Sequence, residues 1–169
     1  MTYAIVYDSQ TGNTALLAER IRKVLPAENL IYFGAPSAEA LRADILFVGS
    51  WTDKGTCCEK IAQFLKSLQT KRVFLFGTAG FGCSAAYFAQ IGNRMAENLS
   101  DGNVLLGTYL CQGKMPLSVR ARYEALSKTD KEKAKPMLEN FDRALSHPDQ
   151  EDLEKLENTV IGTLATVCK

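Results

Sequence analysis

Short apolar runs alternate with amphipathic segments along the whole chain. Five of the runs have the length and the residue types of β-strands, and the segments between them place apolar residues at helical spacing. The expected strands are Tyr3 to Tyr7, Leu30 to Phe33, Ile45 to Gly49, Arg72 to Phe76 and Val104 to Leu110. A strand followed by a crossover, repeated along the chain, predicts an α/β fold with a parallel sheet and helices on both faces.

The expected helices follow the strands. They run from Thr14 to the residue before Pro26, from Ser37 to Arg42, from Thr56 to Leu68, from Ser84 to Leu99 and from Glu151 to Val167. The third apolar run is continuous, without polar alternation, which is typical of a parallel strand that is buried on both faces. We therefore expect Ile45 to Gly49 to be the central strand.

One stretch, from about 115 to 146, does not fit this repeat. It separates the fifth strand from the last helix, and its apolar residues fall at helical spacing, which predicts an insert of one or two helices packed on the domain. From Lys114 to Arg143 the sequence has eight Lys or Arg and five Asp or Glu residues. Such a surface is either an ordinary solvated face or a docking patch for a partner, with Arg120 and Arg122 as candidate contacts.

Composition narrows the class of protein. A chain of 169 residues with 46% hydrophobic residues is expected to form one domain, residues 1–169. The net charge of +1 gives no broad basic field for nucleic acid, and no apolar run approaches the roughly 20 residues of a membrane span. The start of the chain shows no export signal, so we expect a cytoplasmic protein.

The candidate chemistry begins where the first strand meets the first helix. Ser9, Gln10, Thr11, Gly12, Asn13 and Thr14 make up this connection. Its three hydroxyls and its one glycine suit a loop whose backbone N–H groups face an anion at the helix N-terminus. The stretch therefore predicts a bound phosphate.

Two further loops follow strands and are expected at the same edge of the sheet, where open α/β sheets bind ligands. The loop from Ser50 to Thr56 contains Trp51, the only tryptophan, and the loop from Thr78 to Cys83 contains Phe81 between two glycines. Rings on such loops are poorly placed for the core. With the phosphate loop they predict a ligand that has an anionic tail and a flat ring, stacked by Trp51 and with Phe81 as a second candidate.

Several motifs resemble those of one protein family. The stretch from Tyr7 to Thr14 is similar to the FMN-phosphate loop of flavodoxins, and the order of the elements is similar to their fold over nearly the whole chain outside the insert. More narrowly, GSWTDKGT (49–56), FGTAG (76–80), CQGK (111–114) and SHPD (146–149) resemble one branch of flavodoxin-like proteins. Some members of that branch are associated with the reduction of bilirubin through a separate reductase.

The resemblance implies a doubly wound sheet with strand order 2-1-3-4-5 and a noncovalently bound FMN. The implied cofactor-binding residues are Ser9, Gln10, Thr11, Gly12, Asn13, Thr14, Ser50, Trp51, Thr52, Gly55, Thr78, Ala79, Gly80, Phe81 and Gly82. The implied function is electron transfer from a donor reductase to an acceptor enzyme, with a bilirubin reductase as a candidate partner. The protein would tune the flavin and supply no catalytic residue and no metal site.

Three other functions remain alternatives. An NAD(P)H-dependent flavin or quinone reductase would keep the flavin and act as an enzyme. A receiver-type signalling domain would use Asp8, Asp53, Thr78 and Lys114 around a magnesium ion. A dinucleotide site is suggested only by the loose G-x-G-x-x-A pattern at 80–85, which follows the fourth strand and not the first.

The cysteines and the single histidine add little chemistry. Five cysteines in a chain without an export signal suggest reduced thiols, and Cys57 and Cys58 are adjacent but form no C-x-x-C pair. His147 is the one candidate proton shuttle. Because it precedes Pro148 and the last helix, we expect a structural role at that helix N-terminus.

Overall fold

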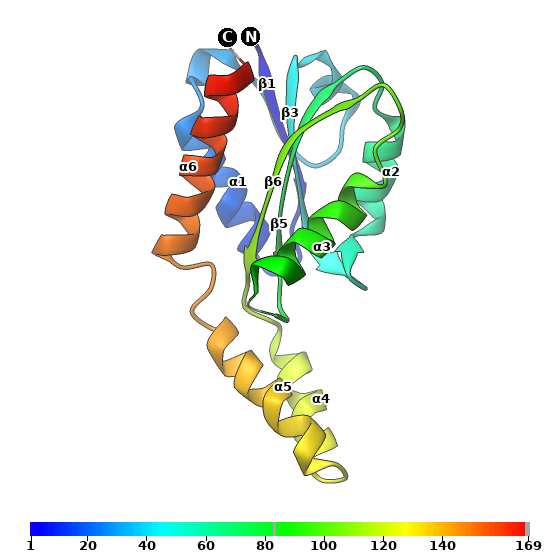
Figure 1. Ribbon diagram of the computed structural model, residues 1–169, viewed down its shortest axis with the longest axis vertical. Helices are drawn as coiled ribbons and strands as arrows, with labels where there is room; N and C mark the ends of the chain where they lie inside the picture. The colour runs from blue at the N-terminus through cyan, green and yellow to red at the C-terminus, as the bar shows by residue number, and fades with distance from the viewer. Residues whose placement is uncertain (83, 168–169) are drawn as a thin grey trace.

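The protein is built around one parallel sheet between two helical layers (Figure 1). The structure is a computed structural model, and it describes residues 1–82 and 84–167. The strands are β1 (Tyr3–Asp8), β2 (Leu30–Gly34), β3 (Ile45–Asp53), β4 (Thr56–Cys57), β5 (Arg72–Ala79) and β6 (Val104–Gln112). The parallel strands have the order β2-β1-β3-β5-β6, and β4 pairs antiparallel with the end of β3. This confirms the predicted doubly wound α/β fold.

The helices cover both faces of the sheet. They are α1 (Asn13–Val24), α2 (Glu59–Ser67), α3 (Ala85–Ala96), α4 (Leu117–Ser127), α5 (Lys131–Ala144) and α6 (Gln150–Val167), with short 3₁₀ helices η1 (Ala27–Asn29) and η2 (Ala38–Arg42). Helices α1 and α6 pack against each other on one face of the sheet, and α2 and α3 lie on the other (Figure 1).

Strand β3 occupies the centre of the sheet, as the sequence predicted. Leu46 and Val48 face the core under α2 and α3, whereas Ile45 and Phe47 face the core under α1 and α6. All four side chains are fully buried. Alternate residues of a strand point to opposite faces, so a strand that is covered on both faces needs apolar residues at every position.

The structure corrects the prediction after β3. The strand continues to Asp53, and Thr56 and Cys57 form strand β4 instead of the first turn of a helix. Thr52 pairs with Cys57 and Asp53 pairs with Thr56. These backbone hydrogen bonds hold the segment extended, so helix α2 begins only at Glu59.

The insert forms a helical hairpin that projects from the carboxyl-terminal edge of the sheet (Figure 1). Helices α4 and α5 pack mainly against each other. Their buried side chains, among them Ala134, Phe141 and Ala144, belong to neither core of the sheet. The prediction of helices was right, but the hairpin does not lie flat on the domain, because its apolar residues form a separate contact between α4 and α5.

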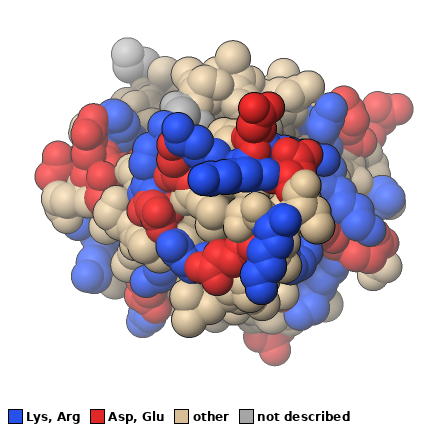
Figure 2. Space-filling model, turned by 90° about the horizontal axis from the view of Figure 1, so that it is seen from below, with Lys and Arg blue, Asp and Glu red and all other residues tan. Residues whose placement is uncertain are grey.

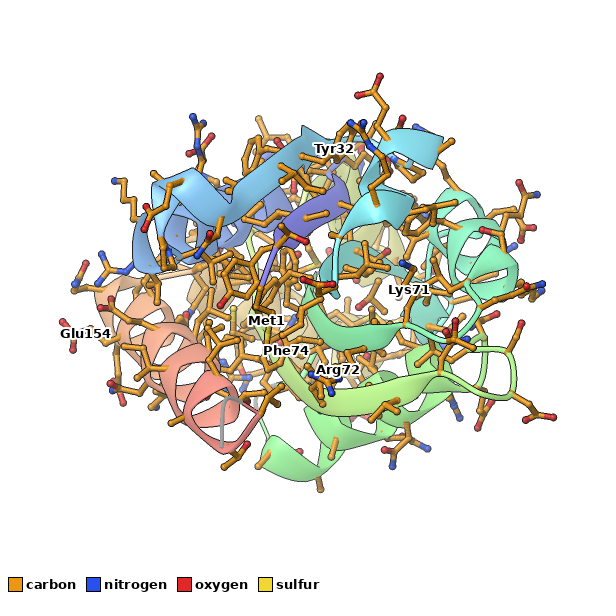
Figure 3. All side chains as sticks on the ribbon, turned by 90° about the horizontal axis from the view of Figure 1, so that it is seen from above. Met1, Tyr32, Lys71, Arg72, Phe74 and Glu154 are labelled. Atoms are coloured by element: carbon orange, nitrogen blue, oxygen red, sulfur yellow. The ribbon has the colours of Figure 1, made fainter. Side chains whose placement is uncertain are left out.

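The opposite edge of the sheet carries the strand beginnings. Figure 3 looks onto this end, where Met1, Lys71 and Arg72 lie, and Figure 1 shows the hairpin at the other end of the molecule. The backbone N–H of Thr2 donates to Oδ2 of Asp44 at 2.7 Å and ties the start of β1 to the segment before β3. Within residues 1–82 and 84–167, no helix is long and apolar enough to span a membrane.

Candidate functional site

The phosphate loop joins β1 to α1 at the edge of the sheet from which the hairpin projects. Gly12 is the residue before α1 and has φ 86° and ψ −11°, a left-handed conformation that favours glycine. A Cβ atom at this position would have no atom within 4 Å. The side-chain oxygen of Ser9 accepts a hydrogen bond of 3.2 Å from the N–H of Ala15. The first turn of α1 therefore starts beside an open and strongly curved backbone, where the helix dipole favours an anion.

Two buried side chains of the phosphate loop tie it to its neighbours. The hydroxyls of Thr14 and Thr78 share a hydrogen bond of 3.2 Å, which joins the start of α1 to the end of β5. Asn13 Nδ2 donates to Oγ1 of Thr11 and to the carbonyl of Lys114, each at 2.8 Å. Loops that are distant in the sequence are thereby held as one unit.

Trp51 lies at the end of β3 with its orientation set by Asp8. The indole Nε1–H donates to Oδ2 of Asp8 at 2.9 Å, and Lys60 Nζ lies 2.8 Å from Oδ1 of the same carboxylate. Cys58 Sγ donates to Oδ2 at 3.7 Å. The lysine and the indole N–H stabilise the charged form and hold the pKa of Asp8 below its usual value, although partial burial opposes them. The Trp51 ring also packs against the core under α2 and α3.

The loop after Trp51 is a tight hairpin turn. Lys54 (φ 49°) and Gly55 (φ 84°) are its two central residues, and both have positive φ, as expected for a two-residue turn between antiparallel strands. A Cβ atom on Gly55 would lie 2.7 Å from Nη1 of Arg94. Sequence reasoning found no signal for this turn, because its strands have only two paired residues each.

Ser50 supports the loop from inside. Its hydroxyl donates to the carbonyl of Trp51 at 2.6 Å and accepts from the N–H of Cys58 at 3.0 Å, and the side chain is 1% exposed. These bonds join the end of β3 to the start of α2. Ser50 therefore positions Trp51 and does not itself reach the cleft.

The third loop is fixed by a buried polar cluster. The carbonyl of Gly80 accepts from Asn140 Nδ2 at 3.0 Å and from Gln112 Nε2 at 3.2 Å, and Gln112 also donates to Oδ1 of Asn140 at 3.1 Å. Asn140 lies on α5, so this cluster joins the base of the hairpin to the loop after β5. Phe81, the next residue, is 44% exposed.

These loops surround a cleft of about 440 Å³. The predicted site residues that line it are Gln10, Thr11, Asn13, Trp51, Thr52, Gly55, Thr78, Ala79, Gly80 and Phe81. The predicted residues outside the lining are Ser9, Gly12, Thr14, Ser50 and Gly82. Of these, Gly12 lines an adjoining hollow of about 270 Å³ on the phosphate-loop side. The structure thus brings the three predicted loops together.

Several lining residues were not among the predicted cofactor-binding residues. Helix α4 contributes Ser118, Val119, Arg122 and Tyr123. The other additional lining residues are Lys54, Tyr87, Gly113, Lys114, Met115 and Pro116. The four α4 positions are two adjacent pairs, with the second pair four residues after the first, so they share one helix face. The sequence indicated a helix here, but not the direction in which the hairpin leaves the sheet, so it carried no signal that α4 borders the cleft.

Two buried polar atoms on residues of the cleft bear on whether a flavin fits there. Thr52 Oγ1 and Asn13 Oδ1 are buried and have no hydrogen-bond partner among the residues that the structure describes, and both residues line the cleft. A buried polar atom without a partner is costly in a folded protein unless a ligand or water satisfies it. The residues fit a flavin with a phosphate tail: an open helix N-terminus for the anion, Trp51 for the ring, and two unpartnered polar atoms on residues that line the cleft.

The receiver-type arrangement is not assembled. Asp8 would have to hold a magnesium ion, but its carboxylate already accepts from Trp51 and Cys58 and pairs with Lys60. At Gly82, the second glycine of the dinucleotide pattern, the ring of Tyr87 lies beside the backbone, 2.3 Å from where a Cβ atom would be. Cys83, within that pattern and the predicted third loop, lies outside the described residues.

The cysteines and His147 are held in the core or at a helix end. Cys57, Cys58 and Cys111 are buried free thiols, and burial raises the pKa of Cys57, which keeps that thiol protonated and unreactive. Cys168 lies outside the described residues. His147 Nδ1 lies 2.6 Å from Oδ2 of Asp152, and Asp149 and Asp152 exchange backbone-to-carboxylate hydrogen bonds at the start of α6. This capping arrangement agrees with the structural role expected of His147.

The chain is similar to known proteins over nearly its whole length. A curated protein from Clostridium symbiosum, named flavodoxin-like domain-containing protein BilS, is 36% identical, and the match covers 97% of this chain and 96% of that one. A BilS protein from Clostridioides difficile is 30% identical, with 90% of each chain covered. Among solved structures, flavodoxin 2 from Bacillus cereus has a TM-score of 0.62 at 20% identity, with 98% of this chain and 99% of that chain covered, and shares the fold. The model of the family described as Flavodoxin domain matches residues 4–161, and the chain belongs to this family.

Proposed function

We propose that this protein binds FMN and carries electrons from a donor reductase to an acceptor redox enzyme. The observation that carries the proposal is the meeting of the open α1 N-terminus with the cleft walled by Trp51. A phosphate and a flat ring joined by a polar chain match this pair of sites. Membership of the Flavodoxin domain family supports the same assignment.

When bound, the flavin supplies the one- and two-electron chemistry. The chain's own residues bind and orient it. The loop Ser9 to Thr14 would hold the phosphate with backbone N–H groups and hydroxyls. Trp51, held by Asp8, would present its ring to the flavin ring, while Thr52 Oγ1 and Asn13 Oδ1 offer hydrogen bonds between the two ends.

The acceptor is proposed from the motifs that the chain shares with one branch of the family. Both curated relatives carry the name BilS and are matched over nearly their whole length. The resemblance of those motifs to proteins associated with bilirubin reduction extends the proposal to a bilirubin reductase as the acceptor. In this scheme the chain has no catalytic acid or base of its own and works in the cytoplasm.

The test is reconstitution of the purified protein. We expect a yellow protein whose apo form binds FMN much more tightly than riboflavin, by at least about 100-fold, because riboflavin lacks the phosphate and its charge-assisted hydrogen bonds. Failure to take up FMN, or equal affinity for riboflavin, would overturn the proposed cofactor site.

A second measurement separates carrier from enzyme. The FMN-loaded protein is mixed with NADPH without oxygen, alone and with a partner reductase. A carrier bleaches only when the reductase is present. Rapid bleaching by NADPH alone would make the protein an NAD(P)H-dependent reductase and contradict the carrier proposal.

A further inference from the structure

The charged residues that line the cleft are of one sign. In the described part of the chain, three exposed cationic residues line the cleft, and no Asp or Glu does. They are Lys54 from the β3–β4 turn, Lys114 from the loop after β6 and Arg122 from α4. None of the three forms an ion pair within residues 1–82 and 84–167. We call these three residues the cationic rim.

The neighbouring Arg120, also on α4, does form ion pairs. Arg120 pairs with Glu124 through Nε at 2.9 Å and also with Asp142 on α5. Its guanidinium carbon lies 5.4 Å from the ring centre of Phe141. Arg120 therefore holds the two helices together, whereas Arg122 lies on the face of α4 that borders the cleft. Of the two candidate docking arginines, Arg120 is engaged in ion pairs, whereas Arg122 forms no ion pair with any described residue.

The proposed cofactor does not neutralise the rim. A phosphate monoester carries about −1.5 to −2 charges at neutral pH. Against it stand the three cations and the N-terminus of α1, which adds roughly half a positive charge. Among the groups that line the cleft, the positive charge therefore exceeds the negative charge that the phosphate would bring.

The hairpin that carries part of the rim is tied to the third loop at its base. Asn140 and Gln112, both buried, fix the base of α5 to the carbonyl of Gly80 in the third loop. A Cβ atom on Gly80 would lie 2.3 Å from Cγ of Met115, so the start of the hairpin packs directly on that loop. The start of the helix that carries Arg122 is therefore held against the third loop. Figure 2 views this end of the molecule, where many Lys and Arg side chains gather with Asp and Glu among them.

We propose that the cationic rim docks an acidic face of a redox protein over the open side of the cleft. The inference rests on the proposed function, because the rim surrounds the place where the flavin would sit. Exposed charges contribute little affinity one by one, but a group of one sign steers an oppositely charged partner and makes association depend on salt. The partner is thus identified by its surface charge.

Electron transfer to haem proteins of opposite surface charge tests the docking. The FMN-loaded protein is reduced without oxygen and mixed with cytochrome b5, whose haem edge is acidic, or with cytochrome c, whose haem edge is basic. Each electron that leaves the reduced protein converts one ferric haem to ferrous haem. Rates are followed at the haem band from about 0.01 M to about 0.3 M ionic strength, with FMN saturating.

We expect the rate with cytochrome b5 to fall about 10-fold or more over this range, and the rate with cytochrome c to fall less or to rise. The double variant Lys54→Gln and Arg122→Gln should lower the low-salt rate with cytochrome b5 about 3- to 10-fold and flatten its salt dependence. The matched control is Lys23→Gln with Lys66→Gln. These residues are exposed in the last turns of α1 and α2, at the opposite edge of the sheet. An equal loss in the control pair, or a preference for cytochrome c, would overturn the inference.

Binding without electron transfer keeps the two proposals separable. Affinity for cytochrome b5 is measured by calorimetry with and without FMN, and a short oligo-dT strand is the alternative polyanion. Weaker binding to cytochrome b5 in the rim variant alone supports the rim even if the protein fails to take up FMN, a failure that would overturn only the cofactor proposal. Equal binding of oligo-dT, lost in the same variant, would assign the rim to nucleic acid and overturn the docking of an acidic protein.

Discussion

The indole N–H of Trp51 donates a 2.9 Å hydrogen bond to the carboxylate of Asp8, 43 positions earlier in the chain. Asp8 ends β1 and Trp51 lies near the end of β3, and these strands are paired neighbours, with Asp8 opposite Ser50. The bond therefore bridges the two loops that would hold the two ends of the flavin. It fixes the ring plane of Trp51 before any ligand arrives, which lowers the cost of ordering the site.

The Asp8 carboxylate should make stability depend on pH in the acid range. Its pKa in the folded protein lies below the ordinary value of 3.8, first because of Lys60 and then because of Trp51. A lowered folded pKa gives stability that is complete above the unfolded pKa and is lost as the pH falls through the folded pKa. Asp8→Asn should cost about 1 kcal/mol near neutral pH, the scale of one hydrogen bond.

Urea unfolding of both proteins over a pH series checks this. The difference between wild type and Asp8→Asn should be constant above about pH 5 and should shrink below pH 3.8, the ordinary pKa of the carboxyl. A difference that stays constant down to the lowest pH at which both proteins fold would contradict the role given to this carboxylate.

Replacing Trp51 tests the proposed stacking. Trp51→Ala should weaken FMN binding about 10-fold and shift the reduction potentials, since a stacked aromatic pair contributes on the order of 1 kcal/mol beyond buried area. FMN fluorescence quenching gives the affinity, and a redox titration gives the potentials. Trp51→Phe keeps a ring but loses the bond to Asp8, so it separates stacking from positioning. Unchanged affinity and potentials in Trp51→Ala would remove this residue from the site.

Two glycines offer a matched test of the phosphate loop. Gly12 and Gly102 both have φ 86°, and a Cβ atom on either would meet nothing within 4 Å. An alanine at each position should therefore cost a similar amount of stability, about 1–2 kcal/mol, from the left-handed backbone alone. Only Gly12→Ala should also weaken FMN binding. Equal FMN affinities in the two variants would argue against phosphate binding at the start of α1.

The buried contact between Asn140 and Gly80 should hold the hairpin in place. Asn140→Leu removes two hydrogen bonds and leaves Gln112 short of a partner, at a cost of about 1–3 kcal/mol. Backbone amides of α5 should exchange with solvent faster, while those of α1 stay protected. Asn93→Leu, on the exposed side of α3, is the control. The same acceleration in both variants would show that the Asn140 contact has no special role.

The sequence pattern was sufficient to predict the fold and the loops of the site, because both depend on local signals. Alternating strands and helices specify a parallel sheet, and parallel strands bring their carboxyl-terminal loops to one edge. Ser9 to Thr14 and Trp51 could be placed there for that reason alone. The loops that they identify do line or adjoin one cleft.

Only the tertiary structure decided what the insert contributes. Its helices could be read from spacing, but the base of the hairpin meets the third loop through Asn140 and Gly80, which are 60 positions apart, and no local pattern encodes such a contact. In the structure the Arg122 face of α4 borders the cleft, whereas Arg120 pairs with Asp142 on α5. Two arginines that look equivalent in the sequence thus take different roles, because side-chain direction on a helix has meaning only once the helix is packed.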